Sequence, residues 1–167
     1  MTSDPAFVWV WLPGALEPVV GGRLDAVGDE LRFTYGASYL KRSDAIPLEP
    51  ETLALDAHTQ RPPVGLDAHG VIRDAAPDAW GMRAILRRLA GKAADDTSAL
   101  PLLTYLLEAG SNRIGALDVT RSPTEWTERV TQGTLTELFE ASERLVSGRP
   151  LTHELHDALR YGTSVGG

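Results

Sequence analysis

The chain has 167 residues, which fits one domain or one and a part of another, and is long enough to bury a hydrophobic core. Hydrophobic residues make up 43% and charged residues 23%, a composition that argues against intrinsic disorder, and the absence of cysteine excludes disulfides, thiolate zinc sites and a cysteine nucleophile. The formal net charge of −7 argues against non-specific nucleic-acid binding by this chain alone.

Three short segments near the N-terminus are predicted to be β-strands. Residues 6–12 are β-branched and aromatic, and residues 19–24 contain two glycines that predict a bend or bulge. In residues 31–35 apolar and polar side chains alternate, which predicts one buried face. Tight turns between the segments predict an antiparallel meander. Residues 45–48, with Pro47, are predicted to add an edge strand, because an edge tolerates a missing N–H.

Two helices and a returning strand are predicted next. A helix should follow Pro77 and end before Gly91, with its arginines on a solvated face and an apolar stripe formed by Met82, Ile85, Leu86 and Leu89. A second helix, capped by Thr97 or Ser98, should run to residue 109. It is so rich in leucine that we expect Leu103 or Leu106 to be fully buried. Residues 113–119 should return as a strand.

The last third of the chain contains one more clear helix and a glycine-rich end. The helix should begin at the capping box of residues 134–137 and end at Gly148, after a polar linker that contains Trp126. A short fourth helix should lead to residues 161–167, where three glycines surround two hydroxyls. Such a loop can bind phosphate through backbone N–H groups. It can equally be a flexible tail, and the residues alone leave both open.

The chain offers few residues for catalysis or metal binding. His153 and His156 have metal-ligand spacing but no evident third ligand, so we predict no metal site. Ser164 lacks the sequence pattern of a hydrolase nucleophile, and no lysine follows the last glycine as it would in a P-loop. We therefore predict no catalytic residue within the chain. No apolar run reaches the roughly 20 residues of a membrane span and the start lacks a signal peptide, so we expect a cytoplasmic protein with no membrane partner.

Taken in order, several segments resemble the N-terminal part of the HipA-type toxin kinases, the serine/threonine kinases of bacterial type II toxin–antitoxin operons. They read V-W-L-P-G, L-R-F-T-Y, A-I-P-L, D-A-A-P-D-A-W-G, R-I-G-A-L and S-V-G-G, at residues 10–14, 31–35, 45–48, 74–81, 113–117 and 164–167. The last segment is similar to the start of the family's S-x-G-G-A-x-x-K nucleotide loop. The resemblance spans nearly the whole chain.

The resemblance implies an α+β fold with an N-terminal antiparallel sheet or small barrel capped by helices. A helical segment would then lead into the glycine loop of a kinase lobe. It places one domain, the sheet with its helices, at residues 1–120. A second region at residues 121–167 would hold the linker, two helices and the start of the nucleotide loop.

The resemblance also implies a function for the full-length parent. The nucleotide loop would be Ser164, Val165, Gly166 and Gly167, and Ser164 would be a regulatory autophosphorylation site. The parent would use ATP and Mg²⁺, would phosphorylate an aminoacyl-tRNA synthetase, and would bind a HipB-like helix-turn-helix antitoxin through which alone it reaches DNA. The family's catalytic and metal-binding residues lie beyond Gly167, so this chain by itself should be inactive and bind no cofactor. The alternative is a stand-alone interaction module, acting as an antitoxin or as an accessory subunit of a split kinase.

Overall fold

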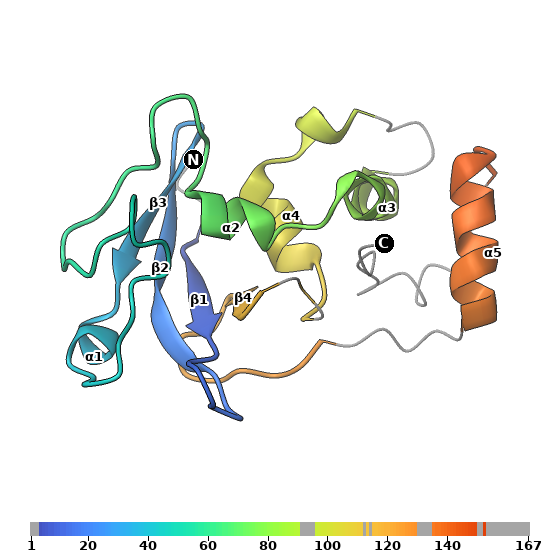
Figure 1. Cartoon of the computed structure of the whole chain (residues 1–167). Coiled ribbons are helices and arrows are strands. Elements are labelled where there is room, and N and C mark those ends of the chain that lie inside the picture. Colours follow the sequence, from blue (N-terminus) through green and yellow to red (C-terminus); the bar gives the residue numbers. More distant parts are fainter. Residues whose placement is uncertain are drawn as a thin grey trace. The chain divides into compact units, whose positions relative to one another are not determined.

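A computed structural model shows four strands in one open antiparallel sheet, in the order β3-β2-β1-β4 (Figure 1). The strands are β1 (Ala6–Val10), β2 (Val19–Val27), β3 (Glu30–Tyr35) and β4 (Leu117–Thr120). The structure describes residues 4–90, 96–111, 113, 115–129, 135–149 and 152. The predicted α+β class and the antiparallel meander are confirmed. Because the sheet is open, the barrel alternative does not apply.

The chain divides into two units. The first comprises Met1–Ala75 and Ile114–Thr127, and the second comprises Ala76–Arg113 and Glu128–Gly167. The predicted division at residues 120 and 121 stays a prediction. The first unit adds α1 (Ala37–Leu40) and α2 (Gly70–Asp74) to the sheet; the second holds α3 (Ala79–Ala90), the 3-10 helix η1 (Thr97–Ala99), α4 (Leu102–Glu108) and α5 (Leu135–Val146). In the described part of the chain, no helix combines the length and apolarity needed to cross a bilayer.

One face of the sheet forms the core of the first unit. The predicted alternation in β3 is confirmed, because every second residue of the strand is buried. Cross-strand pairing brings these side chains together with those of the neighbouring strands. Each buried aliphatic or aromatic side chain contributes about 1.5–3 kcal/mol relative to an exposed one. The buried side chains of this face are Ala6, Val8, Val10, Leu24, Leu31, Phe33, Tyr35, Leu117 and Val119.

A bulge in β2 lies where the two glycines predicted it. Val8 pairs with Gly22 whereas the next residue, Trp9, pairs with Val20, so Gly21 is left as the extra residue. A Cβ on Gly22 would overlap the ring of Phe33 and a backbone carbonyl of β3. Glycine is therefore required at this position by close packing between the strands.

Residues 45–48 do not form the predicted edge strand; side-chain hydroxyls bind this segment instead. The Tyr35 hydroxyl accepts a hydrogen bond from the Leu48 N–H at 2.8 Å and donates to the Leu53 carbonyl at 2.9 Å. Pro47 lies next to the bonded residue and needs no partner for a missing N–H. The strand prediction was wrong because a buried tyrosine supplies the partners that a neighbouring strand would have supplied.

A second tyrosine completes this arrangement, and we call Tyr35 and Tyr39 the tyrosine clamp. The Tyr39 hydroxyl donates to the Ile46 carbonyl at 2.9 Å. The two rings are stacked, with centroids 5.6 Å apart. Burial raises the pKa of Tyr35 to about 12, so the hydroxyl stays neutral across the physiological range. The clamp thus fixes the loop after α1 through neutral groups alone.

The second unit begins with a capped helix. The Asp78 carboxylate accepts a hydrogen bond from the Gly81 N–H at 2.8 Å, which satisfies one of the free donors at the start of α3. Ile85 and Leu86 are buried, as the apolar stripe predicts, but Leu89 is 47% exposed. The stripe is therefore confirmed except in the last turn of the helix.

The predicted helix of residues 97–109 is interrupted. Pro101 separates η1 from α4, because proline has no N–H to continue the first helix. The cap of η1 is Asp96, which accepts from the Ser98 N–H at 2.9 Å, and not Thr97 or Ser98. The expected burial is confirmed, since Leu106 is 0% and Leu103 is 5% exposed.

The predictions for the returning strand and for the last two helices are confirmed in part. The returning strand is shorter than predicted, since β4 spans Leu117–Thr120. Gly148 has a φ of 67° after the end of α5, and the Arg149 N–H bonds the Arg144 carbonyl, which confirms the predicted stop. The capping box at residue 134, the helix end at Gly91 and the fourth helix lie outside the described residues.

Candidate functional site

The predicted nucleotide loop, Ser164, Val165, Gly166 and Gly167, lies outside the described residues, as do His153 and His156. Both sets stay predictions. Within the described residues, no group of three or more histidine and carboxylate side chains could hold a metal ion. The candidate site that the structure does describe is a groove in the first unit.

This groove lies on the face of the sheet opposite the buried core, and we call it the sheet groove. Its volume is about 650 Å³, within the range of about 300–1,000 Å³ that is usual for ligand sites. Residues of β1, β2 and β3, the loop at the start of α1 and one residue after β4 line it. They are Phe7, Trp9, Pro18, Val19, Val20, Gly22, Arg23, Thr34, Tyr35, Gly36, Ser38 and Pro123.

Two aromatic side chains of β1 line the sheet groove. Phe7 is only partly buried although β1 is a central strand. Trp9 is 7% exposed, and its indole N–H donates to the Thr120 hydroxyl at 2.9 Å and to the Ser122 carbonyl at 3.1 Å. The indole is therefore held in one orientation, and it ties the chain after β4 to the wall of the groove. A partly exposed aromatic on a central strand suits an apolar contact with a partner.

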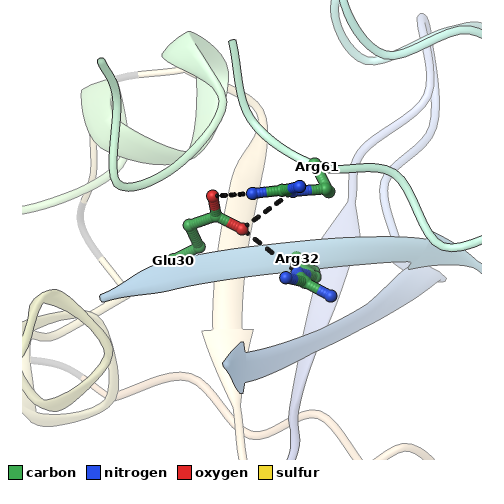
Figure 2. Close-up of polar contacts among 3 residues, drawn as sticks. All are labelled: Glu30, Arg32 and Arg61. Atoms are coloured by element: carbon green, nitrogen blue, oxygen red, sulfur yellow. Dashed lines mark hydrogen bonds and ion pairs between the residues drawn. The ribbon is translucent and has the colours of Figure 1, made fainter. Parts of the chain in front are cut away.

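The charged side chains beside the sheet groove are held in ion pairs. Arg23, a lining residue, bonds Asp25 at 2.8 Å. Farther along the same face of β3, Glu30 bonds Arg61 at 2.5 Å and Arg32 at 3.1 Å (Figure 2). The hydrogen bond from Arg61 lowers the pKa of Glu30, so this carboxylate stays ionised at neutral pH. The groove is thus suited to recognising shape and apolar surface more than a single charge.

A buried carboxylate holds the segment after β4 in place. Asp118 is 0% exposed; it accepts from the Val119 N–H at 2.7 Å and from the indole N–H of Trp126 at 3.0 Å. The ring of Trp126 meets Trp11 edge to face, with centroids 5.0 Å apart. Sequence reasoning placed Trp126 in a polar linker and missed this contact. The signal was the tryptophan itself, because so large an apolar side chain in a polar segment is expected to pack against another part of the protein.

Comparison with known families identifies the family of the chain. A family model described as HipA N-terminal domain matches residues 10–120, more than half of the chain. The chain belongs to this family. A search of curated proteins found no match.

The HipA N-terminal domain match covers the motifs whose contacts are described above. The L-R-F-T-Y segment supplies Tyr35 of the tyrosine clamp, and the A-I-P-L segment is what the clamp binds. The D-A-W-G segment begins with Asp78, the cap of α3. In this chain the L-R-F-T-Y segment thus satisfies backbone groups of the A-I-P-L segment, and Asp78 satisfies a donor at the start of its own helix.

Arg113 of the R-I-G-A-L segment belongs to a second polar arrangement within the second unit. The last turn of α4 leaves carbonyls without helical partners, and guanidinium groups donate to three of them. Arg88 also bonds the Glu108 carboxylate at 3.2 Å and its side chain is only 17% exposed, so the prediction of a solvated arginine face was wrong there. We call this the arginine-capped end of α4: Arg113 donates to the Leu106 carbonyl, Arg129 to that of Leu107 and Arg88 to that of Glu108.

Proposed function

We propose that this chain is the N-terminal regulatory region of a HipA-like toxin serine/threonine kinase of a type II toxin–antitoxin system in the bacterial cytoplasm. The family match over residues 10–120 carries the proposal. Phosphoryl transfer needs a lysine, a base and metal-binding carboxylates in place. The resemblance assigns all of these to the kinase lobe of a full-length parent. The chain therefore contributes regulation and binding, and the parent supplies catalysis with ATP and Mg²⁺ on a substrate of the aminoacyl-tRNA synthetase class.

The partner we propose is a HipB-like helix-turn-helix antitoxin. A protein that binds operator DNA presents a basic surface, and a chain of net charge −7 attracts such a partner. DNA would then be reached only through the antitoxin complex. In the described part of the first unit, the sheet groove is the surface we assign to an apolar anchor of the partner, because the partly exposed ring of Phe7 lines it.

The binding experiment measures association of the 167-residue chain with the helix-turn-helix protein encoded beside its gene, by calorimetry and stopped flow. We expect the association rate to fall as salt rises from about 0.05 to 0.5 M, because screening removes long-range attraction. Phe7→Ser should weaken the affinity by about tenfold or more, as expected for an apolar anchor. Leu16→Ser is the matched control, since Leu16 is 93% exposed and does not line the sheet groove. Absence of binding by the folded chain would overturn the proposal.

The alternative, a stand-alone module acting as antitoxin or accessory subunit of a split kinase, is not favoured by the comparisons. The gene distinguishes the two hypotheses directly. A reading frame that continues from Gly167 into A-x-x-K supports the kinase parent, and a stop codon supports the module.

For the full-length parent, we propose that phosphorylation of Ser164 excludes nucleotide. A phosphate adds about −1.5 to −2 charges at neutral pH, and like charges within one loop repel the phosphates of ATP. Phosphorylated parent should bind ATP more weakly than unmodified parent, and Ser164→Ala should retain nucleotide binding and lose the inhibition. Equal ATP affinity of the two forms, measured by calorimetry, would contradict this role.

A further inference from the structure

A histidine lies fully buried in the first unit, where α2 begins. The side chain of His69 is 0% exposed, and its Nδ1 lies 3.2 Å from the Thr52 hydroxyl oxygen. Its Nε2 is also buried, and the ring interacts with the backbone of Gln60. The backbone carbonyl of His69 accepts from Ile72 and Arg73 and so starts the helix. The ring is therefore part of the joint between α2 and the turn that contains Thr52.

That turn contacts the start of α2 at a second point. The Glu49 carboxylate accepts from the Val71 N–H at 3.2 Å, and the Glu49 carbonyl accepts from the Leu53 N–H at 2.8 Å. One short turn, residues 49–53, thus holds the helix start through a carboxylate and through the hydroxyl of Thr52. The tyrosine clamp binds the same turn from the other side, at the Leu53 carbonyl.

A neutral imidazole suits this position and a protonated one does not. Protonation would place a positive charge at a fully buried position, and the free-energy cost of desolvating that charge exceeds what the Gln60 backbone and the Glu49 carboxylate return. Of the charged groups in the described part of the chain, Glu49 is the one whose charge affects the pKa of the ring. The neighbouring charged residues Asp67 and Arg73 pair with each other at 3.3 Å. Burial lowers the pKa of His69, and it outweighs the opposing effects of Glu49 and of the Gln60 backbone.

We propose that His69 is a proton-sensitive latch, which holds the turn of residues 49–53 against the start of α2 and releases it when the ring is protonated. The pKa in the closed state lies below that of a free imidazole, so the open state binds the proton more tightly. Closure is therefore fully stabilised above about pH 6.5 and is weakened progressively as the pH falls below that value. Because the tyrosine clamp is neutral and does not titrate there, the release is confined to the His69 side of the turn.

Amide hydrogen exchange of the whole 167-residue chain, at about pH 7.5 and about pH 5.5, tests the latch while ordinary carboxylates remain ionised. After correction for intrinsic rates, protection at Val71, Ile72 and Arg73 should fall by up to about tenfold at the lower pH, the limit set by protonation of a free imidazole one unit below its pKa. Amides of β1 and β2 should not change. An equal change in protection between the two pH values at the helix start and in the strands would overturn the proposal.

Variants separate the latch from a general effect of acid. His69→Gln should lose the pH dependence at the helix start, whereas His58→Gln should keep it, because His58 is exposed and pairs only with Asp56 at the surface. Should the His69 variant fail to fold, NMR titration of the wild-type imidazoles gives the answer. The latch requires His69 to titrate below a free imidazole and together with the loss of protection. A His69 ring that titrates like a free imidazole, with protection unchanged, would exclude it.

Discussion

The tyrosine clamp of the first unit and the arginine-capped end of α4 in the second satisfy the same kind of group by different chemistry. Both supply partners for backbone atoms that no regular element pairs. The clamp uses neutral hydroxyls, one of them on a ring that is 3% exposed. The α4 end uses guanidinium groups from separate segments, with Arg88 17% and Glu108 24% exposed. The depth of burial decides which of the two groups can be used, because the free energy of desolvation is far larger for an ion than for a hydroxyl.

The two arrangements should therefore respond differently to change. A buried backbone group that loses its hydroxyl partner, as the Leu53 carbonyl would, has no replacement, since water cannot reach it. A partly exposed guanidinium can be replaced by water or by its neighbours, and salt screens its charge. Loss of a clamp hydroxyl should lower the free energy of unfolding strongly at any salt concentration. Loss of one arginine should lower it modestly and in a salt-dependent way.

The largest effect is expected for Tyr35→Phe, which keeps the ring and removes only the hydroxyl. The buried Leu53 carbonyl would then lack a partner, which costs about 1–3 kcal/mol, and the partly buried Leu48 N–H would lose a hydrogen bond worth about 0.5–1.5 kcal/mol. We expect the free energy of unfolding in urea to fall by about 2 kcal/mol or more. The loss should be the same at low and at high salt, because no charge is removed.

Tyr39→Phe provides the comparison within the clamp. Its partner Ile46 is 40% exposed, so water can replace the lost hydroxyl. We expect a loss of about 0.5–1.5 kcal/mol, the ordinary net value of one hydrogen bond. A larger loss for Tyr39→Phe than for Tyr35→Phe would show that burial does not decide the cost.

The clamp also marks where sequence reasoning reached its limit. β-Branched and aromatic residue types predicted β1, alternation predicted β3, and the glycine pair predicted the bulge of β2, because these signals are local. The edge strand at residues 45–48 was wrong, since nothing local shows that a tyrosine ten or more residues earlier binds that backbone. The sheet groove was missed for a related reason: it depends on residues from three strands and from the segment after β4. The arginine face of α3 was misjudged because the partner of Arg88, Glu108, lies on another helix.

The smallest effect is expected at the arginine-capped end of α4. Arg88→Met retains the aliphatic stem and removes the charge that bonds the carbonyl and the carboxylate of Glu108. We expect the free energy of unfolding to fall by about 0.5–1 kcal/mol at low salt, because the pair is only partly buried. In about 1 M NaCl the Debye length is near 3 Å, and part of this loss should disappear.

Arg83→Met is the matched control for that measurement, since Arg83 lies on the same helix and is exposed. Urea unfolding of both variants at low and high salt separates the specific bond from the general effect of removing a positive charge from an acidic chain. The control should change stability little at either salt concentration. If Arg88→Met instead lost as much stability in high salt as Tyr35→Phe does, the guanidinium at α4 would behave as an irreplaceable buried group. The contrast between the two ways of satisfying free backbone atoms would then have to be abandoned.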